Sequence, residues 1–301
     1  MEHNENKKPK HTVTCPVCGS ENSELYLKTK DYFLTGEEFD LFQCKSCSFI
    51  FTYPVPPPDQ IFTYYDSPEY VSHEIKKSSF FDRVYALARK RNIRYKYGVV
   101  SRFKSSGKIL DVGCGTGELL KYFKDKGWQT SGIEPVEKAR SFAINEYSLD
   151  VFDEKQLHLF DTQTFDVITL WHVLEHVYDL NGRIEELKRL LKSDGVLIIA
   201  VPNINSYDAS FYGKHWGALD VPRHLYHFNQ ETMSALLEKH ALRVIKSYPM
   251  KMDAYYVSLL SERFRETKFP YFKAFLTAQK SNSRARSTGN YSSMIFVIQH
   301  I

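Results

Sequence analysis

The segment ILDVGCGTG, from Ile109 to Gly117, decides the fold of this chain. An apolar run ends there in three glycines and gives way to ELLKYFKDKG, whose apolar residues recur with the period of a helix. The pattern predicts a strand, a tight turn and a helix, with backbone amides aimed outward at the turn. Such a turn is suited to an anionic group of a nucleotide-like ligand.

A second apolar stretch follows and closes with SGIEP, from Ser131 to Pro135. Glu134, near its end, stands about 20 residues after the turn, the offset at which a carboxylate accepts hydrogen bonds from a ribose. We therefore expect Glu134 and Pro135 to lie beside the glycine turn in a nucleoside pocket.

The spacing of the glycines separates two kinds of ligand. A dinucleotide fingerprint needs G-x-G-x-x-G, whose third glycine lets the helix pack close beside a pyrophosphate. Here the glycines are Gly113, Gly115 and Gly117, with Asp111 before them and Glu118 after them. These carboxylates disfavour a doubly charged pyrophosphate and suit one carboxylate beside a cation, as in S-adenosylmethionine. An ordinary strand-to-helix turn without a ligand is the alternative.

The rest of the chain continues the alternation of strands and helices. FDVITLWHV from Phe165 and GVLIIAVPN from Gly195 read as strands buried on both faces of a parallel sheet. A helix between them is expected to stop at Gly195 and to carry on one stripe Ile184, Leu187, Leu190 and Leu191. This order predicts an α/β fold with a doubly wound sheet, whose ligands lie at the carboxyl ends of its strands.

The two strand-end motifs resemble those of the class I S-adenosylmethionine-dependent methyltransferases, whose first motif reads much like DVGCGTG and whose second strand ends in an acid like Glu134. The resemblance implies a mostly parallel, seven-stranded Rossmann-like sheet. It also implies an acidic contact to the adenine from Asp153 or Glu154, of which Asp153 is our candidate. The predicted cofactor-binding residues are Asp111, Gly113, Cys114, Gly115, Gly117, Glu134, Pro135, Asp153, Trp171 and His172.

Four of the five cysteines form two C-x-x-C pairs, CPVC at Cys15 and Cys18 and CKSC at Cys44 and Cys47. Two such pairs can close a tetrahedral four-thiolate zinc site, although the stretch between them is longer than usual. A disulfide framework and a redox motif are the alternatives, and the predicted reducing compartment disfavours the first. With all four ligands supplied by protein, the zinc is expected to be structural.

Composition fits a globular enzyme of two units. The chain has 301 residues, 43% of them hydrophobic, and a net charge of +4. The predicted divisions are a flexible tail (1–12), a zinc ribbon (13–53), a proline and aromatic linker (54–80) and a catalytic domain (81–301). MEHNENKKPK at the N-terminus has no apolar signal region, and no later stretch is long enough to span a membrane, so a cytoplasmic location is expected.

Thr267 to Ile301 contains no acidic residue, and its basic residues lie between about 267 and 290. We expect a solvated loop between the last two strands. A surface for an anionic substrate is the alternative.

Histidine is the usual base near neutral pH, and three groups compete for that role. These are His172 and His176 in WHVLEHV, His215 in GKHWG, and His224 and His227 in PRHLYHF. The first group begins at a strand end, and its Glu175 and His176 are expected to start the next helix. The last group lies in an aromatic insertion from which side chains can fold over a donor methyl group. Each histidine could instead be a hydrogen-bonded structural residue.

The whole arrangement resembles a bacterial methyltransferase family of the Methyltransf_23 type and is similar to zinc-containing sugar C-methyltransferases. In those enzymes a segment similar to HEHLSYF carries a proposed general base, which the match places on His224. His224 and His227 are therefore our catalytic candidates. The position of a catalytic tyrosine of those enzymes is occupied here by Val221, which cannot do the same work. Methylation of an oxygen atom is therefore at least as well supported as methylation of a carbon atom. Tyr64, Tyr65 and Tyr70 are expected to cover the donor, as similar tyrosines do in relatives.

The principal hypothesis is a methyltransferase that acts on a small molecule such as a sugar, a lipid precursor or a secondary metabolite. An rRNA or tRNA methyltransferase that binds RNA through its zinc ribbon is the alternative. The chain lacks an Asn/Asp-Pro-Pro-Tyr-like clamp before WHVL, and its ribbon is not conspicuously basic. Both points favour a small-molecule acceptor over RNA. A binding protein that keeps the cofactor fold without turnover is a third interpretation, which the intact glycine turn and Glu134 disfavour.

Overall fold

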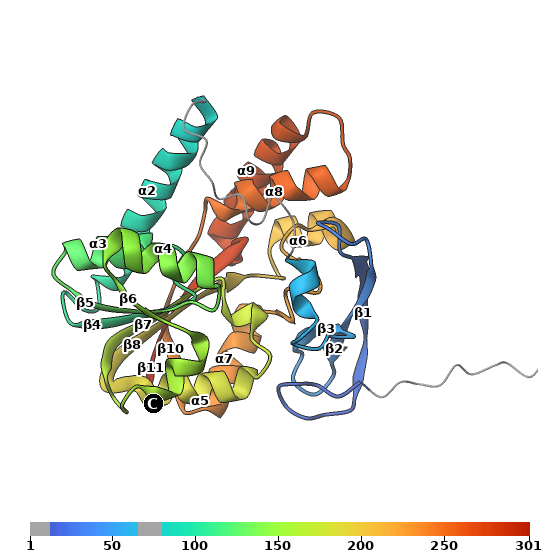
Figure 1. The fold of residues 1–301 in the computed structure, drawn as a ribbon. Helices are drawn as coiled ribbons and strands as arrows, with labels where there is room; N and C mark the ends of the chain where they lie inside the picture. The colour runs from blue at the N-terminus through green and yellow to red at the C-terminus, as the bar shows by residue number, and fades with distance from the viewer. Residues whose placement is uncertain (1–12, 66–79) are drawn as a thin grey trace, which may run out of the picture.

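The computed structural model describes residues 13–65 and 80–301, except the side chains of residues 80–86. Within these ranges the strands form one sheet of seven strands and one of four (Figure 1). No helix in the described part of the chain combines the length and the apolar character that crossing a membrane would need.

The larger sheet has the strand order β10-β11-β8-β7-β4-β5-β6. Its strands β6, β5, β4, β7 and β8 run parallel, while β11 is antiparallel to both β8 and β10. This confirms the predicted seven-stranded, mostly parallel sheet. The bounds are β4 Lys108–Val112, β5 Gln129–Ile133, β6 Asp150–Phe152, β7 Phe165–Trp171, β8 Leu191–Pro202, β10 Leu242–Pro249 and β11 Ser293–His300.

Helices cover both faces of this sheet. In Figure 1, α3 and α4 lie on one face with α2 beside them, and α5 and α7 lie on the other. The bounds are α2 Phe80–Val100, α3 Glu118–Asp125, α4 Glu137–Tyr147, α5 Leu180–Leu190, α6 Tyr207–Tyr212, α7 Gln230–Lys239, α8 Asp253–Phe264 and α9 Pro270–Thr288. Short 3-10 turns are η1 Ile61–Tyr64, η2 Glu154–Leu159, η3 Leu174–His176 and η4 Gly213–His215.

The central strands are buried on both faces, which is why their sequences read as continuous apolar runs. Ile109 and Leu110 in β4 and Ile168 and Leu170 in β7 have no exposed surface. Strand β4 pairs with β5 on one side and with β7 on the other. The strand order therefore reverses between β4 and β7. Ligands of doubly wound sheets bind in the crevice beyond such a reversal.

The smaller sheet joins two distant parts of the chain. It contains β1 Ser23–Lys30, β2 Glu38–Cys44, β3 Ile50–Tyr53 and β9 Tyr226–His227, in that order. Strand β9 comes from PRHLYHF and pairs antiparallel with β3, with Ile50 opposite His227 and Phe51 opposite Tyr226. The cysteine-containing segment is thereby held against the loop that carries the candidate histidines.

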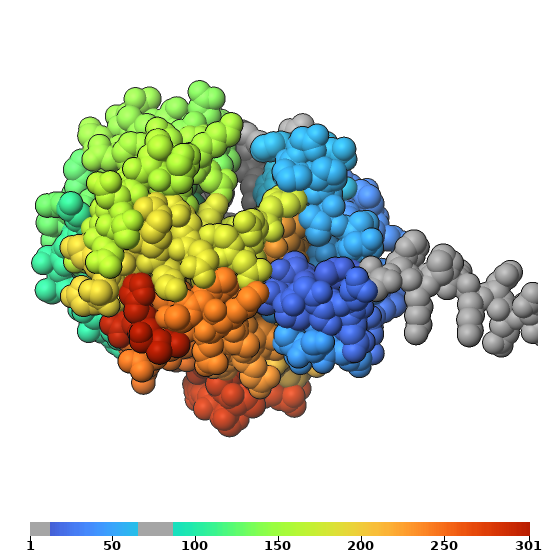
Figure 2. Space-filling view, turned by 90° about the horizontal axis from the view of Figure 1, so that it is seen from below, coloured from blue at the N-terminus to red at the C-terminus, as the bar shows by residue number. Residues whose placement is uncertain are grey.

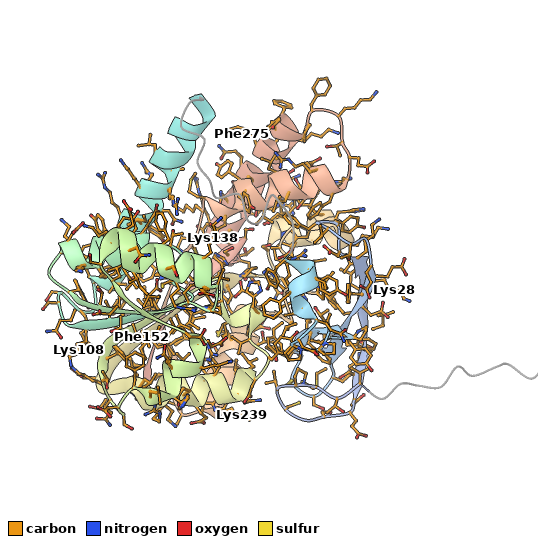
Figure 3. The ribbon with its side chains drawn as sticks, in the orientation of Figure 1. Lys28, Lys108, Lys138, Phe152, Lys239 and Phe275 are labelled. Atoms are coloured by element: carbon orange, nitrogen blue, oxygen red, sulfur yellow. The ribbon has the colours of Figure 1, made fainter. Side chains whose placement is uncertain are left out.

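Contacts at the lower edge of the molecule fix the N-terminal sheet further. Seen from below, its blue residues pack against the yellow and orange segments of the larger domain (Figure 2). Lys239 at the end of α7, labelled in Figure 3, donates to the carbonyl of Val17 at 2.6 Å. Asn181 donates to the carbonyl of Pro16 at 3.1 Å.

Three local predictions are wrong. The basic segment is not a loop but contains helix α9, which starts with Pro270 and ends before Gly289 at a φ of 76°. Its small residues Ala274, Ala278, Ser281 and Ala285 are buried, and Phe275, labelled in Figure 3, is half exposed. Helix α5 ends at Leu190 because Leu191 already belongs to β8, so Gly195 is not its stop. Glu175 and His176 lie in the 3-10 turn η3 rather than in the next helix, which starts after the cap Asp179.

Candidate functional site

The glycine turn after β4 has the backbone shape that only glycine adopts readily. Gly113, Gly115 and Gly117 have φ angles of 73°, 56° and 78°. A Cβ at Gly113 would overlap the side chain of Val173, and one at Gly117 would come within 2.7 Å of Leu149. A Cβ at Gly115 would meet nothing within 4 Å, so this peptide faces open space. The outer glycines therefore pack against protein, and the middle one is available to a ligand.

Gly113→Ala is expected to destabilise the fold by about 2 kcal/mol or more, because it adds left-handed strain to a clash with Val173. Urea unfolding measures the change. Gly98→Ala in α2 is the matched control, since a Cβ there meets nothing within 4 Å. The control should leave stability unchanged or raise it by about 0.5–1 kcal/mol. Equal midpoints for the Gly113 variant and the wild type would contradict the strain argument.

Glu134 connects this turn to the end of β5. Its carboxylate accepts hydrogen bonds from the backbone N–H of Gly115 at 2.8 Å and of Val136 at 2.9 Å. The residue is only 6% exposed. Arg140 donates to the Glu134 carbonyl at 2.6 Å and lies 3.4 Å from the carboxylate of Asp153. The ends of β4, β5 and β6 thus meet around one group of polar contacts.

The two acids after β6 have different partners. Asp153 accepts from the backbone N–H of Lys155 at 3.0 Å and caps η2, and its other oxygen faces Arg140. Glu154 is committed to an ion pair with Arg183. Asp153 is therefore the better placed of the two to face a ligand beside β5.

Asp111 and Cys114 lie beneath the turn. Asp111 accepts a 2.5 Å hydrogen bond from Thr169, and burial raises its pKa to about 6 against the opposing effect of that bond. Burial also raises the pKa of the Cys114 thiol. A Cβ at Gly132 would come within 2.7 Å of the Cys114 sulfur, so this thiol packs against β5. Both side chains support the turn from the interior.

Strand β7 ends at Trp171, and His172 follows it directly, so WHVLEHV begins at a strand end as predicted. Lys96 lies 4.5 Å above the Trp171 ring. His172 has a φ of 57°, and its Nε2 lies 3.0 Å from the Asp253 carboxylate. Burial alone would lower the pKa of His172, but Asp253 and Glu175 outweigh it and raise the pKa to about 9. This imidazolium therefore ties the strand end to helix α8.

Glu175, His176 and His224 come together from two segments of the chain, and we call them the Glu175 cluster. Nε2 of His224 lies 4.0 Å from a carboxylate oxygen of Glu175, and the two imidazole rings are 4.7 Å apart. Nδ1 of His176 lies 2.9 Å from the Arg223 carbonyl, and Nδ1 of His224 lies 2.9 Å from the Ala218 carbonyl. Sequence reasoning named the histidines separately and did not predict that they meet.

Glu175 is fully buried, and among the described residues neither carboxylate oxygen receives a hydrogen bond. Burial opposes its ionisation, yet the surrounding histidines lower its pKa to about 2. For His176, burial and then the neighbouring His224 lower the pKa to about 4. The cluster is a buried group of charge-bearing side chains next to the glycine turn.

The other two candidate histidines lie elsewhere. Nε2 of His227 is 3.0 Å from the hydroxyl of Thr52. That hydroxyl donates a hydrogen bond to the His224 carbonyl at 2.7 Å. Burial lowers the pKa of His227 to about 3. The ring of His215 lies 5.0 Å from that of Tyr32, by the N-terminal sheet. A groove of about 570 Å³ beside it is lined by Lys28, Thr29, Lys30, Tyr32, Glu38, Asp40, Lys214, His215, Phe264, Arg265 and Glu266.

A buried ion pair that sequence reasoning missed holds the histidine loop in place. Arg223 donates from one guanidinium nitrogen to Asp31 at 2.8 Å and to Asp220 at 2.7 Å, and from another to the Tyr64 carbonyl at 2.7 Å. The side chains of Arg223 and Asp31 are 1% and 0% exposed. Asp31 belongs to the N-terminal segment, so this pair joins that segment to the residue before His224.

The structure describes two of the three tyrosines that were predicted to cover the donor. Tyr64, at the end of η1, is buried and donates at 2.5 Å to Glu37, which precedes β2. The Tyr65 hydroxyl lies 3.2 Å from Nδ1 of His176. Tyr70 lies outside the described residues.

The four cysteines of the two C-x-x-C pairs lie together as predicted. Cys15 and Cys47 have their sulfurs 3.6 Å apart, and so do Cys18 and Cys44. All four sulfurs lie within 4.8 Å of one another. These separations are too long for disulfides, whose sulfurs are about 2.05 Å apart.

Comparison with known proteins identifies the fold and its chemistry. The sequence of residues 84–247 matches the methyltransferase domain family Methyltransf_23. A ubiquinone biosynthesis O-methyltransferase of Actinobacillus pleuropneumoniae is 32% identical over 173 residues, which cover 52% of this chain and 72% of that protein. One from Rhodopseudomonas palustris is 26% identical over 144 residues, covering 46% of this chain and 57% of its own length.

Among solved structures, an S-adenosylmethionine-dependent methyltransferase of Archaeoglobus fulgidus has the same fold, with a TM-score of 0.50 and 19% identity. The alignment covers 71% of this chain and 94% of that one. The family match includes the glycine turn, Glu134 and the strand that leads to the Glu175 cluster. The chain belongs to the Methyltransf_23 family and is a class I S-adenosylmethionine-dependent methyltransferase.

Proposed function

We propose that this enzyme methylates an oxygen of a small-molecule acceptor that binds in front of the Glu175 cluster. The observation that carries the proposal is the position of this cluster, because it follows β7 directly and so lies beside the glycine turn. The relatives from Actinobacillus and Rhodopseudomonas are named as O-methyltransferases of ubiquinone biosynthesis, which supports a small acceptor with a hydroxyl group.

The residues around the turn fit S-adenosylmethionine, which supplies an electrophilic methyl group on a sulfonium. Gly115 has no neighbouring side chain within reach of a Cβ, so a ligand can approach the turn there. Glu134, which accepts from the Gly115 N–H, stands where it would also accept hydrogen bonds from the ribose hydroxyls. Asp153 would face the adenine, with Trp171 and His172 as the wall at the end of β7. Asp111, Gly113, Cys114, Gly117 and Pro135 would shape the turn rather than contact the reacting atoms.

His224 is the proposed acceptor of the hydroxyl proton. Its Nδ1 must donate to the Ala218 carbonyl, which leaves the lone pair of the neutral ring on Nε2, toward Glu175. His227 is a weaker candidate because its Nε2 is engaged by Thr52. Methyl transfer otherwise depends on alignment of the acceptor oxygen with the donor methyl group.

A buried reaction centre favours a small acceptor over RNA. Glu175 has no exposed surface, and His224, in the loop that pairs with the N-terminal sheet, is 8% exposed. A nucleotide within a polymer would need an open approach or extrusion into the site. Salt-sensitive retention of RNA by the purified protein, with methylation of that RNA, would reverse this preference.

We also propose that Cys15, Cys18, Cys44 and Cys47 bind a structural zinc ion. Tetrahedral zinc with Zn–S bonds of about 2.3 Å places its sulfurs about 3.8 Å apart. The separations of 3.6 Å for two of the pairs fit that requirement. Four protein thiolates leave no open position for a substrate, so the ion would hold the N-terminal sheet together.

Glu134→Ala is expected to weaken S-adenosylmethionine binding by about tenfold or more, because a charged acceptor of hydrogen bonds is lost from a nearly buried position. Titration calorimetry measures the affinity. Glu137→Ala, at the exposed start of α4, is the matched control and should bind like the wild type. Equal affinities for both variants would show that Glu134 does not contact the cofactor.

The proposed reaction is tested with labelled S-adenosylmethionine and a panel of small hydroxylated rings, sugars and lipid precursors. Label is expected in a product that carries a new methyl ether. Labelling of RNA alone, or of carbon atoms alone, would contradict an oxygen acceptor of low molecular weight.

A further inference from the structure

We propose that the Glu175 cluster binds a divalent cation, with Glu175, His176 and His224 each supplying one ligand atom. The inference deepens the proposed function and rests on it, since the cation would bind the acceptor oxygen. One carboxylate and two imidazoles suit a first-row ion such as Zn²⁺, Co²⁺ or Fe²⁺ rather than Mg²⁺ or Ca²⁺.

The first observation is the spacing of the ligand atoms. One oxygen of Glu175 and one nitrogen of each histidine all lie within 4.8 Å of one another. Small side-chain movements would bring the three atoms to metal-bonding distance. Apart from the four cysteines, this is the one group of three or more metal-binding side chains found in residues 13–65 and 80–301.

The second observation is the orientation of the imidazoles. Metal-binding histidines usually donate their other ring N–H to a carbonyl or carboxylate, which fixes the tautomer. His176 directs Nδ1 to the Arg223 carbonyl at 2.9 Å, and His224 directs Nδ1 to the Ala218 carbonyl at 2.9 Å. Since a carbonyl only accepts, both Nδ1 atoms carry the proton, and both Nε2 atoms are left with a lone pair.

The third observation is the carboxylate of Glu175. It is 0% exposed, and neither oxygen has a hydrogen bond among the described residues. The His172 imidazolium, which also contacts Asp253 at 3.0 Å, pairs with one oxygen of Glu175 at 3.4 Å, so the carboxylate has one charge partner and still no hydrogen bond from the described residues. Buried charges are paired, hydrogen-bonded or bound to metals. A cation would satisfy this carboxylate and both lone pairs together.

Three protein ligands would leave open positions at the ion, as in catalytic metal sites. An acceptor hydroxyl bound there would ionise more readily. Its O–H bond breaks and the proton passes to water, while the oxygen electron pair forms the new bond to the methyl carbon. The C–S bond breaks with its electron pair left on sulfur, which becomes a neutral thioether. With the ion bound, His224 is a ligand, and the ion takes over the task assigned to the free base.

Cobalt binding to the full chain tests the site without an acceptor. The cysteine site is first filled with zinc, and Co²⁺ is then added by equilibrium dialysis while the visible spectrum is recorded. We expect one equivalent of Co²⁺ with ligand-field bands and without the charge-transfer band of thiolate ligands. His224→Ala and Glu175→Gln should each weaken this binding by at least about 100-fold, since even outer-sphere partners are worth 10–100-fold.

His215→Ala is the control and should bind Co²⁺ like the wild type, because that ring lies by Tyr32 and outside the cluster. Circular dichroism establishes that the variants fold. Absence of a Co²⁺ equivalent beyond the cysteine site, or equal affinity in folded His224→Ala, would overturn the proposal. Methyl transfer that survives chelation but not His224→Ala would also overturn it and leave the proposed function intact. Cobalt binding without methylation of small hydroxylated acceptors would support the site and contradict the proposed function.

Discussion

Replacing Cys44 by serine is expected to abolish binding of the proposed zinc ion and to destabilise the N-terminal sheet. Cys44 is fully buried, ends β2 and forms backbone hydrogen bonds with Phe49 and Ser48 across the turn into β3. Binding of a structural zinc ion contributes on the order of 10 kcal/mol to the folding of small domains. Without it, strands β1 to β3 keep only their own pairing and their contacts with the larger domain.

The loss should extend to the catalytic loop, because β3 pairs with β9 at His227 and Tyr226. Metal analysis of Cys44→Ser should show one equivalent less zinc than the wild type, and methyl transfer should fall by at least about 100-fold as the histidine loop loses its alignment. Binding of S-adenosylmethionine should change much less, since β4, β5 and the glycine turn lie in the other sheet.

Cys114→Ser is the matched control, because Cys114 packs against β5 and is not one of the four clustered cysteines. It should keep the full metal content. A folded Cys44→Ser protein with undiminished zinc would show that the four sulfurs do not hold the ion.

Local sequence patterns were sufficient to predict the seven-stranded sheet and its glycine turn. The three glycines after Val112 need left-handed backbone, and the sequence alone indicated a turn there. The cap of α7 has the same local character, since the side chain of Asn229 accepts from the N–H of Thr232 three residues later. These features depend on residues within one turn or strand, where periodicity and capping chemistry carry the information.

The site depended on contacts that no local pattern reveals. Strand β9 is two residues long, too short for a periodic signal, and its partner β3 lies more than 170 residues earlier. The pairing of Arg223 with Asp31 spans 192 residues. His224 was named through a family resemblance, while its meeting with Glu175 required the fold. The helical α9 was predictable in principle, because its buried small residues recur near helical spacing.

Asp31→Ala is expected to destabilise the protein by about 3–5 kcal/mol, because it removes the fully buried carboxylate partner of the Arg223 guanidinium and leaves only the partly exposed Asp220. Asp40→Ala, in strand β2 of the N-terminal sheet, is the matched control. Asp40 pairs with Lys28 at 3.9 Å on the surface, and its loss should cost about 0–1 kcal/mol. Urea unfolding at neutral pH measures both, and similar losses would contradict a buried pair.

The same pair should appear in acid unfolding. Burial opposes the ionisation of Asp31, but its hydrogen bonds with Arg223 and nearby backbone amides hold its pKa below the ordinary value. The contribution of Asp31 is therefore complete above a pH of about 4 and is lost as the pH falls through the lower pKa of the folded state. Asp31→Asn should remove this part of the acid transition.

A double replacement separates stability from positioning. Asp31→Leu with Arg223→Met removes both charges, and replacement of a buried ion pair by apolar side chains is often neutral or stabilising. If the pair only stabilises the fold, this variant regains both its unfolding midpoint and its activity. We expect the midpoint to recover only in part, because the backbone amides of residues 33–35 lose the Asp31 carboxylate. The value of kcat should stay at least about tenfold below the wild type, because the Arg223 guanidinium also holds Asp220 and the Tyr64 carbonyl around the loop of His224. The KM for S-adenosylmethionine should not change, since Glu134 and the glycine turn are untouched. Arg223 is on this argument a positioning residue, and full recovery of kcat would show that it is not.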